Sequence, residues 1–326
     1  MFFVIFVAIL VFMKIVFMGT PPLAVPHLEA IAREHEIVGV VTQPDKMARR
    51  GRKMEAASSA VKMRALEMNF PVLQPERARD ESFVAQIRAL RPEAIAVVAY
   101  GQILPQTLLD IPAENFPNGA CLNVHFSLLP RWRGAAPVQR AIQHGDTHSG
   151  VTVQWMVAKL DAGDVLLQES VAIENGETSP QLLERLTPIG ARLLNQALQM
   201  LGDGNAPRVP QNESAVTMAP SIDKDEARVD WNLGARQIEN LARAFVPWPV
   251  AWCHWRGESL KIWQCRASDE KVSSAAGTIA VRDGAVLVAC GSGALQLLRV
   301  QAAGKAKLDA LDWARGARLE AGAALE

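Results

Sequence analysis

The chain has 326 residues, of which 49% are hydrophobic and 21% charged, and its 34 basic residues balance its 34 acidic ones. This composition excludes a long disordered chain, a collagen-like repeat and a disulfide scaffold, and the length suggests two domains. A net charge of zero argues against a protein held to nucleic acid by its overall charge, but it leaves room for a local basic patch.

The first twelve residues, MFFVIFVAILVF, are apolar and uncharged. They lack the basic segment and the small-residue cleavage site of a secretory signal. Lys14 interrupts the run before it reaches the roughly 20 residues that a membrane span needs. The segment is then a signal anchor, an apolar segment packed on the first strand, or an extension upstream of a start at Met13. We favour the last and expect residues 1–12 to lie outside the folded domains.

From Lys14 onwards, apolar runs alternate with segments of helical periodicity, which is typical of βαβ units and a parallel sheet. The sequence predicts strands over Lys14–Met18, Ile37–Thr42, Val72–Gln74, Ala94–Val98, Ala120–Val124, Val151–Met156 and Val165–Ile173. It predicts helices over Val25–Glu34, Ser59–Met68, Asp80–Leu90, Pro137–His144 and Ser179–Met200. Residues 13–201 are therefore expected to form an α/β domain, with its ligands beyond the carboxyl ends of the strands.

Residues 202–222 are rich in Pro, Gly, Asn and Ser, as linkers are. Further short strands are predicted over Ala251–Trp255, Leu260–Cys265, Thr278–Val281, Val286–Ala289 and Leu295–Val300. So many short strands favour a small β-barrel, similar to the OB fold, over residues 223–326.

The four cysteines, at 121, 253, 265 and 290, form no C-x-x-C pair. This spacing argues against a disulfide framework and a zinc ribbon, and it fits a protein of the reducing cytoplasm. We expect no metal ion to be bound.

A cluster of polar residues follows the predicted strand Ala120–Val124, in the stretch NVHFSLLPRWRGAAP. Strand alternation puts Asn123 and His125 on one side, where an amide and an imidazole can donate hydrogen bonds to one carbonyl oxygen. The same residues can instead cap the strand end by bonding to nearby backbone. Asp161, in LDAGD between two later strands, can orient His125 or move a proton, or it can simply form an Asx turn. Spacing alone does not bring Asp161 to His125.

The segment KMARRGRK holds five cations and no acid: Lys46, Arg49, Arg50, Arg52 and Lys53. Such local positive charge binds phosphate backbones, and it also occurs in solvated, mobile loops. The second half of the chain adds several tryptophans, which fit either a core or a platform on which bases stack.

At NVHFSLLPRWRGAAP and LDAGD the chain resembles the 10-formyltetrahydrofolate-dependent formyltransferases. The stretches MKIVFMGTPPLAV, VVAYGQILP and ARVDWNLGARQIENLARAFVPWPVAW extend the resemblance from about Met13 to Gly316. Across the whole chain it is similar to the branch of this family that formylates initiator methionyl-tRNA. The resemblance implies a Rossmann-like parallel-sheet domain followed by an OB-like domain that helps to hold tRNA.

The resemblance also implies roles for individual residues. Asn123, His125 and Asp161 become the catalytic trio. The folate site is lined by Ser127, Leu128, Leu129 and Pro130, with Tyr100, Gln102, Ile103 and Leu104 nearby. The basic loop contacts the acceptor stem of the tRNA, with Arg50 as the best match to the family's key arginine. We expect a cytoplasmic monomer with no membrane partner.

Three departures from the family pattern stand out. Phe126 replaces the usual Gly or Ala, so its ring is expected to narrow the folate pocket. In the basic loop, Met47 and Arg49 replace a proline and a glycine.

The alternative function is formyl transfer to a small amine, such as glycinamide ribonucleotide or an amino sugar. An RNA-binding module with an inactive Rossmann domain is the alternative from another class.

Overall fold

The computed structural model describes residues 12–50, 53–268, 270, 274–320 and 322–326, but not the side chains of residues 46, 48–50 and 53–56. The expected extension therefore lies outside the described residues, apart from Phe12. The contacts divide the chain into two compact units. The first contains residues 1–133, 150–170 and 184–218, and the second contains residues 134–149, 171–183 and 219–326.

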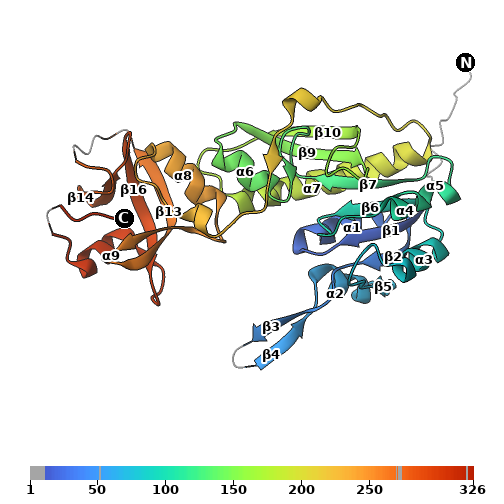
Figure 1. Ribbon diagram of the computed structural model, residues 1–326, viewed down its shortest axis with the longest axis horizontal. Coiled ribbons are helices and arrows are strands. Elements are labelled where there is room, and N and C mark those ends of the chain that lie inside the picture. Colours follow the sequence, from blue (N-terminus) through green and yellow to red (C-terminus); the bar gives the residue numbers. More distant parts are fainter. Residues whose placement is uncertain (1–11, 51–52, 269, 271–273, 321) are drawn as a thin grey trace, which may run out of the picture. The chain divides into compact units, whose positions relative to one another are not determined.

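The first unit is built on a seven-stranded sheet with the order β10-β9-β7-β6-β1-β2-β5 (Figure 1). Its strands are β1 (Lys14–Gly19), β2 (Glu36–Val41), β5 (Val72–Leu73), β6 (Ala94–Val98), β7 (Ala120–His125), β9 (His148–Trp155) and β10 (Val165–Ala172). Its helices are α1 (Val25–Ile31), α2 (Ala60–Glu67), α3 (Glu81–Ala89), α4 (Gln106–Leu109) and α5 (Ile111–Asn115). Helix α7 (Ser179–Gly202), with Pro188 inside it, contributes residues to both units.

The core of the first unit explains why its strands are continuously apolar. All five residues of β6 are buried, and β6 pairs in parallel with both β1 and β7. A strand covered on both faces has no polar side, so it shows no alternation. The predicted α/β architecture is confirmed, and each predicted strand and helix of this region is present.

The sheet is not parallel throughout, because β7 pairs with β9 in the antiparallel direction. This pairing sets Gln154 opposite Asn123 and Thr152 opposite His125. Continuous apolar runs do not report strand direction, so the sequence alone did not predict this reversal. It matters for the site, because it brings polar residues of β9 beside the end of β7.

The basic segment also differs from the expected loop. It forms an antiparallel hairpin of β3 (Lys46–Arg50) and β4 (Lys53–Ala57), which extends away from the seven-stranded sheet (Figure 1). The register pairs Arg50 with Lys53. Closely spaced cations take the place of the alternating apolar residues that predict a strand, so the sequence shows no strand signal here.

The second unit is an antiparallel sheet with three helices. Five strands lie in the order β12-β13-β16-β15-β14, and β17 pairs with β16. They are β12 (Ala251–Trp255), β13 (Glu258–Ser268), β14 (Ile279–Arg282), β15 (Ala285–Ala289), β16 (Ala294–Ala302) and β17 (Leu308–Asp309). The helices are α6 (Pro137–Gln143), α8 (Ala235–Ala244) and α9 (Ala310–Ala317). The predicted β-rich second domain is confirmed.

Residues 203–218, which the composition assigned to a linker, belong to the first compact unit. They include the short helix η2 (Glu213–Ala215) and the start of β11 (Met218–Ala219), which pairs with β8 (Arg133–Gly134). Two further single-turn helices are η1 (Pro22–Ala24) and η3 (Asp225–Ala227). No helix in the described part of the chain has the length and apolar character to cross a membrane.

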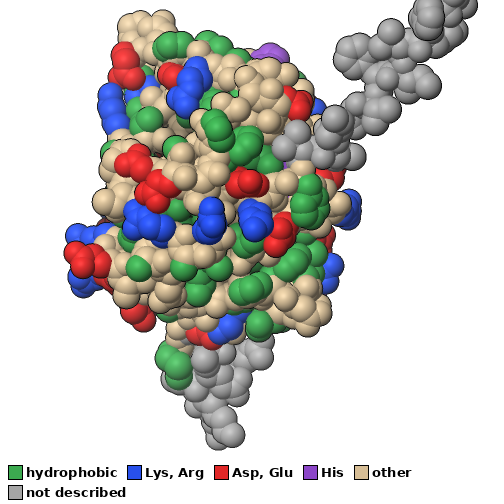
Figure 2. All heavy atoms as spheres, turned by 90° about the vertical axis from the view of Figure 1, so that its right-hand side faces the viewer, with side chains coloured by type: hydrophobic (Ala, Val, Ile, Leu, Met, Phe, Trp, Pro, Cys, Tyr) green, Lys and Arg blue, Asp and Glu red, His purple; other side chains and the backbone are tan. Residues whose placement is uncertain are grey.

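Side chains of both charge signs are mixed on the face shown in Figure 2. Neither sign gathers there into a large area of its own. On this face the mixture accords with the net charge of zero.

Candidate active site

Strand β7 ends in the two polar residues that the sequence singled out. Asn123 and His125 are two residues apart, so the strand directs both side chains to the same face. His125 is buried, and its Nε2 lies 2.8 Å from the backbone oxygen of Trp132. Because a carbonyl can only accept, Nε2 must carry a proton and donate it. The other ring nitrogen, Nδ1, is therefore the one available for chemistry.

Asp161 meets both of these residues. One carboxylate oxygen, Oδ2, lies 3.6 Å from His125 Nδ1, and the other, Oδ1, lies 3.5 Å from the Asn123 amide nitrogen. Gln154 donates a 2.9 Å hydrogen bond to Oδ1. The structure thus brings together three residues that the sequence places up to 38 positions apart.

The loop that carries Asp161 is held in a specific conformation. Asp161 has a φ of 47°, in the left-handed region that few residues other than glycine adopt. A Cβ on Gly163 would collide with the backbone oxygen of Trp155, so this position requires glycine. The conformation of the loop sets the direction of the Asp161 carboxylate.

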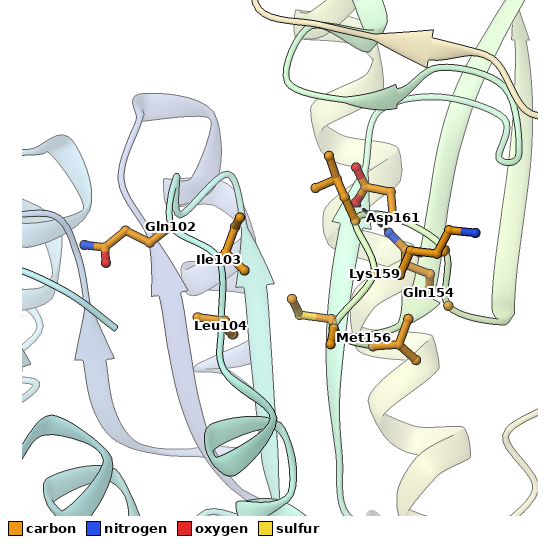
Figure 3. A pocket seen from close by; sticks show the side chains of 12 residues that line it. Gln102, Ile103, Leu104, Gln154, Met156, Lys159 and Asp161 are labelled. Atoms are coloured by element: carbon orange, nitrogen blue, oxygen red, sulfur yellow. Dashed lines mark hydrogen bonds between the residues drawn. The ribbon is translucent and has the colours of Figure 1, made fainter. Parts of the chain in front are cut away.

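A hollow of about 100 Å³ lies beside Asp161 (Figure 3). Gln102, Ile103 and Leu104 line it from the loop after β6, and residues 154 and 156–163 line it from the other side. Most of its side chains are apolar. Gln154 is 2% exposed, and its Oε1 has no hydrogen-bond partner among the described residues. The hollow therefore offers mainly apolar walls.

The other residues predicted to hold folate lie outside this hollow. Ser127, Leu128, Leu129 and Pro130 form the turn after β7, where the Ser127 hydroxyl donates to the backbone oxygen of Arg131. Tyr100 is buried, which raises the pKa of its phenol to about 12. The folate role of these five residues stays a prediction.

Phe126 does not line the hollow either. Its buried ring packs edge-on against His27, with the ring centroids 6.0 Å apart. The expectation that this ring narrows the pocket therefore receives no support from the hollow beside Asp161.

The basic hairpin can be placed only in part. Arg52 lies outside the described residues, and the side chains of Lys46, Arg49, Arg50 and Lys53 are not described. Their proposed contact with tRNA stays a prediction.

The second unit contains a larger hollow that the sequence did not reveal. It measures about 700 Å³, and its lining includes Arg243, Arg266, Arg299, Lys307 and Trp263. Lys307 lies over the Trp263 ring, with its Nζ 3.1 Å from the ring centroid. Arg266 and Arg299 are exposed and form no ion pair with a described acid. Arg266 lies on β13 and Arg299 on β16, so no run of cations in the sequence indicated this hollow.

Two further residues of the site were missed. Gln154 follows the alternation of VTVQW, where a polar residue in an apolar strand is a readable signal. Gln211 lies in the segment predicted as a linker and had no such signal.

Within the described residues, no three His, Cys, Asp or Glu side chains come together as a metal site requires.

Comparison with known proteins identifies the family. The family model "Formyl transferase" matches residues 13–198, and "Formyl transferase, C-terminal domain" matches residues 221–318. Solved structures of similar fold include WlaRD, a sugar 3N-formyl transferase crystallised with dTDP and 5-N-formyl-THF. It has a TM-score of 0.65 at 18% identity, covering 90% of this chain and 99% of that one. HypX from Aquifex aeolicus in complex with tetrahydrofolic acid has a TM-score of 0.61 at 18% identity, covering 95% of this chain and 48% of that one.

Curated relatives are much more similar in sequence. The methionyl-tRNA formyltransferase of Stenotrophomonas maltophilia (strain R551-3) is 46% identical over 309 residues, which are 94% of this chain and 98% of that protein. The methionyl-tRNA formyltransferase of Alkaliphilus oremlandii (strain OhILAs) is 40% identical over 312 residues, with 95% and 98% covered. The chain therefore belongs to the methionyl-tRNA formyltransferase family and is a transferase.

Proposed function

We propose that the protein transfers the formyl group of 10-formyltetrahydrofolate to the α-amine of methionine on initiator methionyl-tRNA. The observation that carries this proposal is the meeting of Asn123, His125 and Asp161 beside an apolar hollow. The similarity to methionyl-tRNA formyltransferases supports the acceptor, and the folates used in the WlaRD and HypX structures support the donor class.

The lining of the hollow beside Asp161 suits the ring of a folate in chemical character. A folate derivative supplies the formyl group, and its flat heterocycle needs apolar walls together with a few polar partners. Ile103, Leu104 and Met156 provide such walls, and Gln102, Gln154 and Asp161 are among the polar residues of the lining. We also assign Ser127, Leu128, Leu129, Pro130, Tyr100 and Gln102 to the surroundings of the folate.

The catalytic trio acts on the formyl carbonyl. The amine attacks the formyl carbon, and negative charge develops on the formyl oxygen. The bond from the formyl carbon to the folate nitrogen then breaks, and that nitrogen leaves with the proton lost by the amine. The Asn123 amide and protonated Nδ1 of His125 donate hydrogen bonds to that oxygen, which stabilises the charge. Asp161 lies 3.6 Å from Nδ1, where it orients the imidazole and accepts a proton on its way from the amine to the leaving nitrogen.

The tRNA requires sites for its phosphates. We assign this role to the cations of the hairpin, namely Lys46, Arg49, Arg50, Arg52 and Lys53, and to the basic hollow of the second unit. Exposed arginines beside a tryptophan offer both charge for phosphates and a face for a base. Formylation of initiator tRNA belongs to translation, so we expect the protein to act in the cytoplasm, as a monomer.

One assay tests the proposed function. The full chain is incubated with 10-formyltetrahydrofolate and, separately, methionyl-tRNA, free methionine, glycinamide ribonucleotide or a nucleotide-linked amino sugar. Formylated product is expected when methionyl-tRNA is the acceptor and not with the other three acceptors. Transfer to a small amine without transfer to methionyl-tRNA would overturn the proposal.

A further inference from the structure

Behind the candidate active site, one side chain connects two loops that are distant in sequence. Arg133 is 2% exposed, and its Nε and Nη2 donate to the side-chain oxygen of Gln211 at 3.0 and 2.8 Å. The amide nitrogen of Gln211 donates in turn to the backbone oxygens of Asp161 and Gly163, at 2.8 and 2.7 Å. Gln211 therefore joins Arg133 to the loop that carries Asp161.

The orientation of the Gln211 amide is fixed by its partners. A guanidinium has only donors, so it must face the amide oxygen, and two carbonyls have only acceptors, so they must face the amide nitrogen. If the amide turned over, donors would face donors and acceptors would face acceptors, and all four hydrogen bonds would be lost. The bond to a charged guanidinium also polarises the amide, which strengthens its donation to the carbonyls.

Thr217, six residues after Gln211, holds the backbone that contacts His125. The Thr217 hydroxyl accepts a 2.9 Å hydrogen bond from the Trp132 backbone nitrogen, and the Thr217 carbonyl accepts one of 2.9 Å from the Arg133 nitrogen. Trp132 is the residue whose carbonyl fixes Nε2 of His125. Residues 211–217 thus anchor the backbone on both sides of the 3.6 Å approach between His125 and Asp161.

Arg133 has a charged partner as well as Gln211. Arg133 is almost fully buried, yet its nearest carboxylate belongs to Glu213, whose side chain is 61% exposed. Glu213 also pairs with Lys159, which lines the hollow, and hydrogen bonds from Arg133 and Lys159 lower the pKa of Glu213. The ion pair with Glu213 compensates the charge of Arg133, while the bonds from its Nε and Nη2 to Gln211 fix the position of that amide.

We propose that Arg133 and Gln211 are positioning residues, which hold the Asp161 carboxylate against His125 through the backbone of the Asp161 loop. The left-handed backbone of Asp161 needs such support, because the surroundings must stabilise this conformation. This proposal rests on the catalytic role of Asp161 in the proposed function. It predicts that Gln211 acts on the chemical step and only through Asp161.

A double-mutant cycle tests the proposal. The full-length wild type, Gln211→Leu, Asp161→Asn and the double variant are compared in single-turnover formyl transfer to methionyl-tRNA. Gln211→Leu is expected to slow transfer by about 10- to 100-fold while the KM for the folate changes by less than about threefold. In the Asp161→Asn background, the same substitution is expected to change the rate by less than about threefold, because nothing is left to position.

Each outcome has a defined meaning. If Gln211→Leu slows the Asp161→Asn variant as much as the wild type, its role is general stability and the positioning proposal is wrong. If Asp161→Asn itself transfers formyl groups at the wild-type rate, the catalytic trio is wrong and the positioning proposal fails with it.

Two variants guard against a trivial loss of folding. Gln211→Glu still accepts from Arg133 but sets an oxygen against the two carbonyls, and it replaces Gln211→Leu in the cycle if that variant does not fold. Gln199→Leu is the matched control, because Gln199 lies in the same unit and its side-chain amide donates to Glu34, in the turn after α1. Its transfer rate is expected to stay within about twofold of the wild type, and a similar loss there would overturn the assignment.

Discussion

Mild acid should destabilise the protein through His27, a fully buried histidine of α1. Its Nδ1 donates to the Leu23 backbone oxygen at 3.0 Å, so the ring is neutral, with a lone pair on Nε2. Nε2 has no partner among the described residues, and a Cβ on Gly190 of α7 would lie only 2.6 Å from it. A second proton would be buried without an acceptor, and burial lowers the pKa of His27 from 6.5 to about 4.

The sign and size of the effect follow from this shift. The unfolded chain takes up a proton below pH 6.5, whereas the folded protein takes it up only near pH 4. Stability is therefore complete above pH 6.5 and falls as the pH is lowered through this window. At 1.36 kcal/mol per unit, the total loss is about 3 kcal/mol, of which about 2 kcal/mol falls between pH 7 and pH 5.

Urea unfolding at pH 7 and pH 5 measures this loss. His27→Leu keeps an apolar side chain without a titrating group, so its free energy of unfolding should fall by about 2 kcal/mol less than that of the wild type over this range. His35 is also buried with a lowered pKa, but it is present in both proteins and cancels. The control His148→Leu changes an exposed histidine and should follow the wild type. Equal pH dependence in His27→Leu and the wild type would refute the reasoning.

Three further predictions concern the sites. Asp161→Asn should lower kcat about 100-fold with little change in folate KM, measured by steady-state formyl transfer. Replacing both Arg299 and Lys307 with alanine should weaken methionyl-tRNA binding and reduce the slope of log Kd against log salt by about 2. Filter binding from 50 to 300 mM salt measures this slope. An unchanged slope would show that the hollow of the second unit does not contact tRNA phosphates. Gly163→Ala should reduce both stability, by about 1–3 kcal/mol in thermal unfolding, and kcat, because the added Cβ meets the Trp155 carbonyl.

Periodicity predicted the long strands of both units and helices α1, α2, α3, α6 and α7, because buried strands and amphipathic helices leave a direct pattern in the sequence. Helices α4, α5, α8 and α9 were not predicted. The strand Ala94–Val98 has the same bounds in the structure as in the prediction. Strand direction was not accessible, and the antiparallel pairing of β7 with β9 depends on how the loops route the chain. The hairpin of β3 and β4 was missed because its cations replace the apolar alternation that marks a strand.

The site was predictable where its residues share one element. Asn123 and His125 lie on one strand, so their common face follows from alternation. The approach of Asp161 to His125 depends instead on a left-handed residue and on hydrogen bonds from Gln211, neither of which has a local signature. Composition predicted a linker over residues 202–222, and composition cannot show that such a segment carries a side chain that holds a catalytic loop.

The zero net charge is consistent with a tRNA substrate once charge is considered by site. The chemistry needs few charges, namely one carboxylate and one imidazole in a largely buried setting, where their interaction is strongest. The proposed tRNA contacts need exposed cations, and these are concentrated in the hairpin sequence and in the hollow of the second unit. Because the two sets share no residue, substitutions in the cationic sites should act on tRNA binding, and substitutions around Asp161 on turnover. The face shown in Figure 2 carries both charge signs, and such a mixed face attracts unrelated nucleic acids less than a uniformly basic one would.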